Sequence, residues 1–131
     1  MGGKIDVFPQ KLHYAGEEKM TVGELAGVLG LEVLTGDTNL DREVRSGYTS
    51  DLLSDVIANI GDDAVWITIQ RHVNILGVAK LKDVPAIIIP RKLQLEEGFI
   101  TKARQEDIAI LRGSASAFEL SGLIYNELKR G

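Results

Sequence analysis

From residue 64 onward, the chain alternates between short runs of apolar residues and longer stretches in which apolar residues recur at helical spacing. The apolar runs, which predict buried strands, lie at 64–69, 86–89 and 108–111. The helical stretches lie at 73–81, 93–105 and 115–129. Strands and helices that alternate over short links form right-handed crossovers, so we predict a parallel sheet. Because the strands are apolar on both sides, helices should cover both faces of this sheet.

The first part of the regular pattern predicts one more helix and two more strands. Thr21 and Glu24 have the spacing of a capping box, and the helix that they begin should end near Gly30. Alternating residues predict strands at 31–35 and 43–47. We expect this pair of strands to join one edge of the sheet. The predicted fold is therefore α/β, with a mixed, mostly parallel sheet and helices on both faces.

A further amphipathic helix is predicted between the strand at 43–47 and the apolar run at 64–69. Thr49 or Ser50 should cap it, and Gly61 should end it. Asp51 and Asp55 fall in its predicted early turns, where the helix dipole favours anions. Its apolar stripe consists of Leu52, Leu53, Val56, Ile57 and Ile60.

Residues 1–19 differ from the rest of the chain because glycine and proline interrupt every period. We expect an N-terminal tail over 1–19, with a short strand at 5–8 as the alternative. Residues 20–131 then form a single α/β domain.

Composition narrows the class of protein. The chain has 131 residues, of which 44% are hydrophobic and 26% charged, a balance typical of one globular domain. It has no cysteine, which excludes disulfides and favours a reducing compartment. No apolar run approaches the roughly 18 residues of a membrane helix, and the first residues lack the apolar stretch of a secretory signal. We expect a cytoplasmic protein that binds no membrane, and its net charge of −4 disfavours nucleic acid as a partner.

A basic residue follows each of the three predicted parallel strands. The carboxyl ends of parallel strands share one edge of a sheet, and helix N-termini point toward the same edge. Cations there oppose the helix dipole, which suggests a bound anion, with Arg71 and Arg91 as bidentate anchors for a phosphate-bearing small molecule. Two other interpretations stay open: solvated arginines in surface salt bridges, or an edge that a partner subunit covers. The candidate ligand-binding residues are Gln70, Arg71, His72, Arg91, Arg112 and Ser114.

The sequence shows no catalytic constellation. His72 has no partner base that the sequence can name, and only one other histidine, His13, exists. No phosphate-cradling P-loop is present, Ser114 is best explained as the cap of the last helix, and the acidic residues lack the spacing of a metal site. We therefore expect a non-catalytic protein with no cofactor and no metal. The alternatives are a small-molecule transferase or hydrolase that uses His72 and the arginines, and a pure protein-interaction subunit.

Two aromatic residues have two interpretations each. Tyr48 either stacks on a ligand or packs over the sheet edge. Trp66, in a predicted buried strand, belongs either to the core or to an oligomer contact.

Three segments carry a family resemblance: LEVLTG at 31–36, LDREV at 40–44 and GYTSDLLSDVI at 47–57. Together with the order of elements over about 20–130, they resemble the N-terminal domain of HPr kinase/phosphorylase and the related DRTGG domain, which occurs beside CBS domains and in some phosphotransacetylases. The resemblance implies a regulatory module without catalysis of its own, found in oligomeric proteins, so we expect a homodimer. A phosphate-bearing ligand is implied by analogy with the related N-terminal domain of Mur ligases.

The chain departs from the motif that gives the DRTGG domain its name. It has Gln70-Arg71-His72 where that motif begins with Asp-Arg, so only Arg71 is retained. It has Ile89-Pro90-Arg91 in place of Thr-Gly-Gly. The loops of this chain are therefore expected either to bind differently from those of the family or not to bind its ligand at all.

Overall fold

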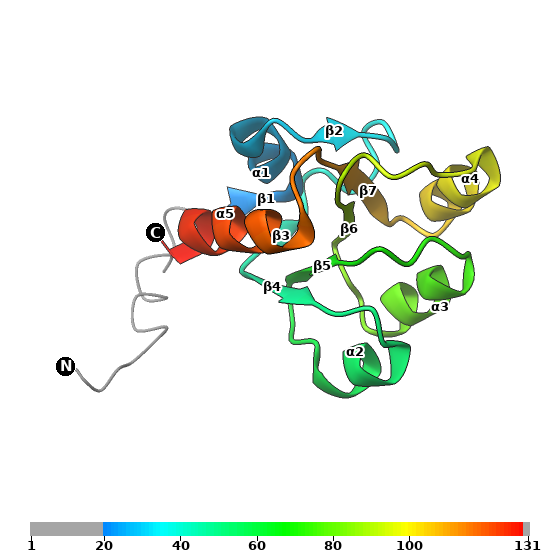
Figure 1. The fold of residues 1–131 in the computed structure, drawn as a ribbon. Coiled ribbons are helices and arrows are strands. Elements are labelled where there is room, and N and C mark those ends of the chain that lie inside the picture. Colours follow the sequence, from blue (N-terminus) through cyan, green and yellow to red (C-terminus); the bar gives the residue numbers. More distant parts are fainter. Residues whose placement is uncertain (1–19, 130–131) are drawn as a thin grey trace.

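The computed structural model describes residues 20–129, which form a five-stranded sheet with helices on both faces (Figure 1). The strand order is β2-β7-β6-β5-β4. The strands span Glu32–Val33 (β2), Ser46–Thr49 (β4), Ala64–Ile67 (β5), Ala86–Ile89 (β6) and Ala109–Arg112 (β7). Strands β4 to β7 are parallel, and β2 runs antiparallel to β7. The predicted mixed, mostly parallel sheet is confirmed, as are the three apolar strands at its centre.

Each of the central strands β5, β6 and β7 sends alternate side chains into two separate cores. Trp66 and Ile87 face one core, whereas Ile67 and Ile88 face the other. The first core is covered by Leu53–Asn59 (α2), Asn74–Leu81 (α3) and Glu97–Gln105 (α4). The second is covered by Val22–Leu29 (α1) and Ala117–Lys129 (α5). This explains why the central strands are apolar at every position.

Trp66 is a core residue. Its side chain is 0% exposed, and its indole N–H donates to the carbonyl of Ser50 at 2.8 Å. Tyr48 packs against the same core, and its hydroxyl donates to Asp55 at 2.8 Å. Both aromatic side chains are therefore engaged within the fold.

The two predicted N-terminal strands do not join one edge, so that expectation is wrong. Strand β2 pairs with β7, and β4 pairs with β5 at the opposite edge. The predicted strand at 43–47 is divided at Arg45: Glu43–Val44 (β3) pairs with Met20–Thr21 (β1) as a separate antiparallel sheet. The physical reason is that β4, α2 and β5 form a parallel crossover unit, which makes β4 the neighbour of β5 rather than of β2.

Helix starts also differ from the sequence expectation at three places. The Thr21–Glu24 capping box is present, and Gly30 ends α1 in the left-handed conformation. However, Ser116 caps α5 in place of Ser114, because Ser116 and Glu119 exchange reciprocal hydrogen bonds of 2.9 and 3.1 Å. Helix α4 begins at Glu97 instead of residue 93. Helix α2 begins after Leu52, which is 63% exposed, so the predicted apolar stripe is only partly buried.

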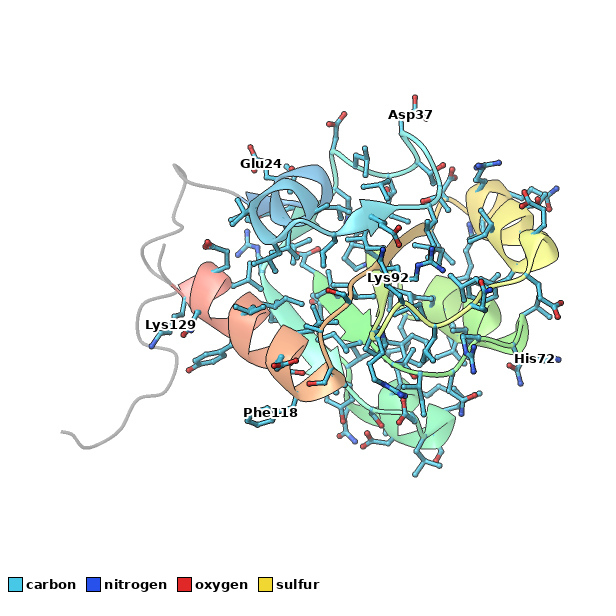
Figure 2. The ribbon with its side chains drawn as sticks, turned by 45° about the horizontal axis from the view of Figure 1, so that its top comes forward. Glu24, Asp37, His72, Lys92, Phe118 and Lys129 are labelled. Atoms are coloured by element: carbon cyan, nitrogen blue, oxygen red, sulfur yellow. The ribbon has the colours of Figure 1, made fainter. Side chains whose placement is uncertain are left out.

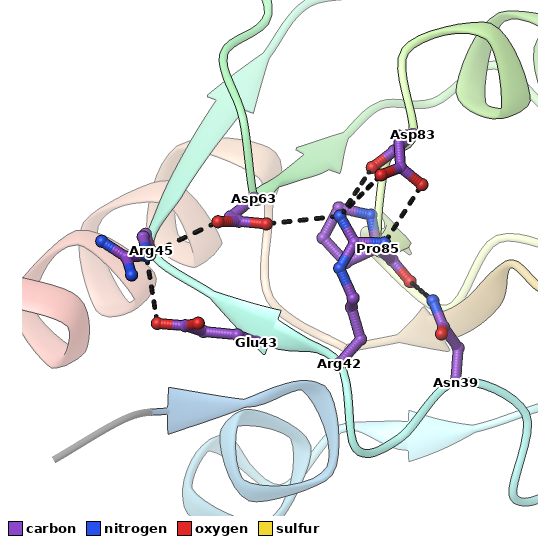
Figure 3. Close-up of polar contacts among 7 residues, drawn as sticks. All are labelled: Asn39, Arg42, Glu43, Arg45, Asp63, Asp83 and Pro85. Carbon is purple, nitrogen blue, oxygen red and sulfur yellow. Dashed lines mark hydrogen bonds and ion pairs between the residues drawn. The ribbon is translucent and has the colours of Figure 1, made fainter. Parts of the chain in front are cut away.

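A polar network closes the amino-terminal edge of the sheet (Figure 3). The Arg42 guanidinium contacts the carboxylates of Asp63 and Asp83 at 3.2–3.3 Å and donates to the carbonyl of Asp83 at 3.0 Å. Asn39 donates to the carbonyl of Pro85 at 2.9 Å. These contacts fasten the 37–45 segment to the turns before β5 and β6, which leaves the opposite edge for a binding site.

No helix in the described part of the chain has the length and apolar character needed to span a membrane. The predicted tail and the alternative strand at 5–8 lie outside the described residues.

Candidate ligand-binding edge

The six residues singled out in the sequence all follow the carboxyl ends of three adjacent parallel strands. Gln70, Arg71 and His72 come after β5, Arg91 after β6, and Arg112 and Ser114 stand at the end of β7. Since β5, β6 and β7 are neighbours, these residues belong to one edge of the sheet. The structure gives them different local roles.

Arg71 joins the loop after β5 to the loop after β6. Its Nη1 donates to the carbonyl of Gln94 at 2.9 Å, and its Nε donates to the carbonyl of Ile69 at 3.3 Å. Both acceptors are neutral, so the guanidinium keeps its full positive charge. Its remaining donors are available because the residue is exposed.

Arg112 is neutralised by Glu32 of the antiparallel strand β2. Its Nε lies 2.6 Å from Glu32 Oε1, and its Nη1 donates to the carbonyl of Leu93 at 3.1 Å. Lys92 lies 3.6 Å from the other carboxylate oxygen. The hydrogen bond from Arg112 holds the pKa of Glu32 below its usual value, and the charges of Arg112 and Lys92 act in the same direction. Arg112 therefore organises the edge and does not offer a free charge.

Arg91 and Lys92 form a strained turn directly after β6. Their φ angles are 55° and 49°, in the left-handed region that glycine occupies at least cost. Their backbone N–H groups donate to the carbonyls of Ala115 and Gly113 at 2.9 and 2.8 Å, which ties this turn to the loop after β7. The Arg91 side chain is exposed and makes no hydrogen bond or ion pair with any residue from 20 to 129. It is a cation without an acidic partner on this edge.

Asp51 supports the same edge, although the sequence placed it in the first turns of a helix. It precedes α2, and its Oδ1 accepts hydrogen bonds from the Thr68 hydroxyl at 2.7 Å and the Ile69 N–H at 2.9 Å. The Gln70 amide donates to the carbonyl of Asp51 at 2.8 Å. Gln70 is thus committed to joining the loops after β4 and β5. Asp51 could not be found from local sequence, because its partners belong to the next strand.

His72 and Ser114 are exposed on this edge. The Nδ1 of His72 accepts a hydrogen bond from the backbone N–H of Asn74 at 3.1 Å, which satisfies a donor at the start of α3. Figure 2 shows the His72 side chain pointing away from the body of the molecule. Within residues 20–129, no three His, Cys, Asp or Glu side chains are grouped so as to hold a metal ion.

Together, these contacts divide the candidate residues into two groups. Gln70 and Arg112 hold loops in place, whereas Arg71 and Arg91 present positive charge that no carboxylate from residues 20–129 compensates. The edge can bind an anion through these two guanidinium groups, each of which suits a phosphate oxygen pair.

No family model matches the chain, and no curated protein matches it. Among solved structures, it is similar to the CBS and DRTGG domains of the regulatory region of Clostridium perfringens pyrophosphatase, in complex with the activator diadenosine tetraphosphate. The TM-score is 0.69 at 13% sequence identity, and the match covers 97% of this chain and 55% of that chain. The chain thus spans about half the length of the protein it resembles. At this identity the likeness shows the fold: an α/β domain of DRTGG-like architecture, which confirms the resemblance found in the sequence.

Proposed function

We propose that this chain is a non-catalytic, cytoplasmic regulatory domain that binds a phosphate-bearing small molecule and acts as a homodimer. The ligand binds at the carboxyl edge of the sheet. Arg71 and Arg91 contact its phosphate groups, His72 and Ser114 lie exposed on the same edge, and Gln70 and Arg112 hold the loops. The observation that carries this proposal is Arg91, a cation without a partner among the described residues, held on a strained turn. Such strain often occurs where a ligand is bound.

The fold likeness supports the same function. The regulatory region with the similar fold was solved with a nucleotide activator, diadenosine tetraphosphate. A nucleotide of this kind carries several phosphates, which suits two arginines that extend from neighbouring loops. The proposal carries over the class of ligand and not the identity of the nucleotide.

The contacts of His72 support a non-catalytic role. Its Nδ1 already accepts a backbone hydrogen bond, and no residue from 20 to 129 orients its other ring nitrogen. A general base needs such an orienting group to hold its tautomer and direction.

Calorimetric titration tests the proposal, with diadenosine tetraphosphate, ATP and inorganic pyrophosphate as probes. We expect at least one probe to bind the full chain. Arg71→Ala and Arg91→Ala should each weaken that binding by about ten- to a hundredfold, the effect of losing one charge-assisted contact. Arg104→Ala is the matched control, because Arg104 is an exposed cation in the last turn of α4, away from this edge. Absence of binding by the wild type, or equal effects of all three variants, would refute the phosphate site.

A further inference from the structure

The loop after β4 carries a carboxylate, Asp51, on the same edge of the sheet as the two arginines of the proposed phosphate site. Strands β4, β5 and β6 are neighbours, so the loops that hold Asp51, Arg71 and Arg91 follow one another along this edge. Neighbouring strands lie about 4.8 Å apart, which places the first and the last of these loops about 10 Å from each other. A ligand that extends from the arginines across the end of β5 therefore reaches Asp51.

Three hydrogen bonds hold Asp51 in place. Its Oδ1 accepts from the Thr68 hydroxyl at 2.7 Å and from the Ile69 N–H at 2.9 Å. The Gln70 side chain donates to the Asp51 carbonyl at 2.8 Å. Thr68 is itself buried, so the carboxylate is fastened to the body of the sheet. A side chain that is already held in position loses little conformational entropy when it binds a ligand.

The second carboxylate oxygen of Asp51 is available to a ligand. Its Oδ2 accepts no hydrogen bond from any residue between 20 and 129, and the residue is exposed. An ionised carboxylate only accepts hydrogen bonds, so its partner must carry donors. An ionised phosphate oxygen also only accepts. Asp51 therefore suits a part of the ligand other than its phosphates.

Asp51 and Arg71 both bond to the backbone of Ile69 without pairing with each other. Asp51 accepts from the N–H of Ile69, and Arg71 donates to its carbonyl at 3.3 Å. Within residues 20–129 no ion pair joins the two side chains, and Arg71 reaches instead to the Gln94 carbonyl in the loop after β6. The edge thus carries positive charge beside β5 and β6 and negative charge beside β4. This order fits a ligand with phosphates at one end and hydrogen-bond donors at the other.

Exposed apolar side chains flank Asp51. Leu52, the next residue in the chain, is 63% exposed, and Ile69 is 41% exposed. Ligand sites combine apolar surface with a small number of placed polar groups. These two side chains offer the carbon face of a sugar a surface to pack against, next to a carboxylate that can accept from its hydroxyls.

We propose that Asp51 is a further ligand-binding residue, whose Oδ2 accepts hydrogen bonds from the hydroxyl groups of a ribose. The ligand is then a ribonucleotide, with its phosphates on Arg71 and Arg91 and its sugar at the loop after β4. In dinucleotide-binding α/β folds, an acidic side chain binds the ribose hydroxyls by the same chemistry. The inference rests on the proposed function, and it names the class of ligand and its direction along that site.

Calorimetric titration of the full chain with ATP, dideoxy-ATP and tripolyphosphate tests the role of Asp51. Dideoxy-ATP lacks both ribose hydroxyls, and tripolyphosphate lacks the whole nucleoside. The wild type should bind ATP about ten- to a hundredfold more tightly than dideoxy-ATP, the effect of one charge-assisted hydrogen bond. In Asp51→Asn this preference should fall to about threefold or less, because the amide nitrogen cannot accept a hydroxyl proton. Tripolyphosphate should bind the variant no more weakly than the wild type.

Asp51→Asn should keep a melting curve close to that of the wild type, since the asparagine oxygen can still accept from Thr68 and Ile69. Asp41→Asn is the matched control. Asp41 is an exposed acid in the segment at the opposite, amino-terminal edge of the sheet. Its substitution removes the same charge and should leave the preference for ATP over dideoxy-ATP unchanged.

The outcomes separate this inference from the proposed function. Equal affinity of the wild type for ATP and dideoxy-ATP would overturn the ribose contact, whatever the variants do. A preference that Asp51→Asn keeps in full would overturn it too, as would an equal gain in affinity for all three probes, which is the effect of charge alone. Each of these results leaves the phosphate site in place if tripolyphosphate binding depends on Arg71 and Arg91. A wild type that binds none of the probes refutes both.

Discussion

The side chain of Thr35 completes the backbone pairing of β7. The backbone N–H of Ile110 donates to Thr35 Oγ1 at 3.0 Å, and the Leu34 N–H donates to the Ile110 carbonyl at 2.9 Å. Both Thr35 and Ile110 are buried. A hydroxyl therefore takes the place of a main-chain acceptor where the short strand β2 has already ended.

Thr35→Val should destabilise the protein by about 1–3 kcal/mol, because it leaves the buried N–H of Ile110 without an acceptor. Thr35→Ser keeps the hydroxyl and should lose less. Urea denaturation followed by circular dichroism measures both. Equal losses in the two variants would mean that the methyl group of Thr35 and not its hydroxyl stabilises this region.

Arg91→Gly should change stability and ligand binding in opposite directions. Glycine adopts the φ of 55° without strain, so the free energy of unfolding should rise by about 0.5–1 kcal/mol. Phosphate-probe affinity should fall with the loss of the guanidinium. Lys92→Gly relieves similar strain and leaves Arg91 in place, so a comparable loss of affinity in that variant would argue against a specific role of Arg91.

Asp107 lies at the turn between α4 and β7 and has a φ of 60°. Asp63 and Asp83, at the turns before β5 and β6, each have a φ of 55°. Asp107→Val should destabilise the fold by about 1–2 kcal/mol, since a β-branched residue tolerates this conformation poorly. Asp107→Gly should leave stability nearly unchanged. Thermal melts of the two variants provide the comparison, and a stable valine variant would contradict the backbone argument.

The ion pair of Glu32 with Arg112 predicts a pH dependence of stability. The pKa of Glu32 is lowered in the folded state from 4.5, so its stabilising contribution is complete above pH 4.5. The contribution is lost as the pH falls from 4.5 through the lowered folded pKa. Glu32→Gln should flatten the dependence of unfolding free energy on pH in that acidic range. An unchanged acid profile in Glu32→Gln would show that the pair adds nothing measurable.

Glu32→Gln should also strengthen binding of the phosphate probes. The substitution removes the carboxylate that compensates Arg112 and Lys92, so the edge becomes more positive. Titration at low ionic strength should show the gain, and added salt should reduce it. Weaker binding would mean that Glu32 orients the edge for the ligand.

The sequence predicts the centre of the fold well and its edges poorly. The runs at β5, β6 and β7 are apolar at every position because both of their faces are buried, and this signal is local. The placement of β2 and β4 at opposite edges depends on which strands they meet, and no residue in either strand encodes that choice. The cap of α5 is ambiguous in the sequence for another reason. Ser116 and Glu119 have the same spacing as Thr21 and Glu24, but Ser114, two residues earlier, is a competing candidate for the cap.

The candidate site is likewise predicted only in part from the sequence. The order of strands places Arg71, Arg91 and Arg112 on one edge, and this follows from the parallel pattern alone. That Arg112 is neutralised could not be predicted, since Glu32 reaches it only because β2 lies antiparallel beside β7. Likewise, the role of Asp51 depends on contacts with Thr68 and Ile69 in the loop after the neighbouring strand.

The position of β2 has a consequence for synthesis on the ribosome. Among residues 20–129, strand β2 pairs only with β7, the strand that comes last in this part of the chain, so about 75 residues must follow Thr35 before its partner Ile110 exists. Strands β4, β5 and β6 are neighbours and can assemble in the order of their synthesis. Contacts between distant residues form late because the intervening chain must first be ordered. We therefore expect nascent chains that stop before β7 to hold the β4–β6 region partly folded, with Glu32–Val33 still open to protease.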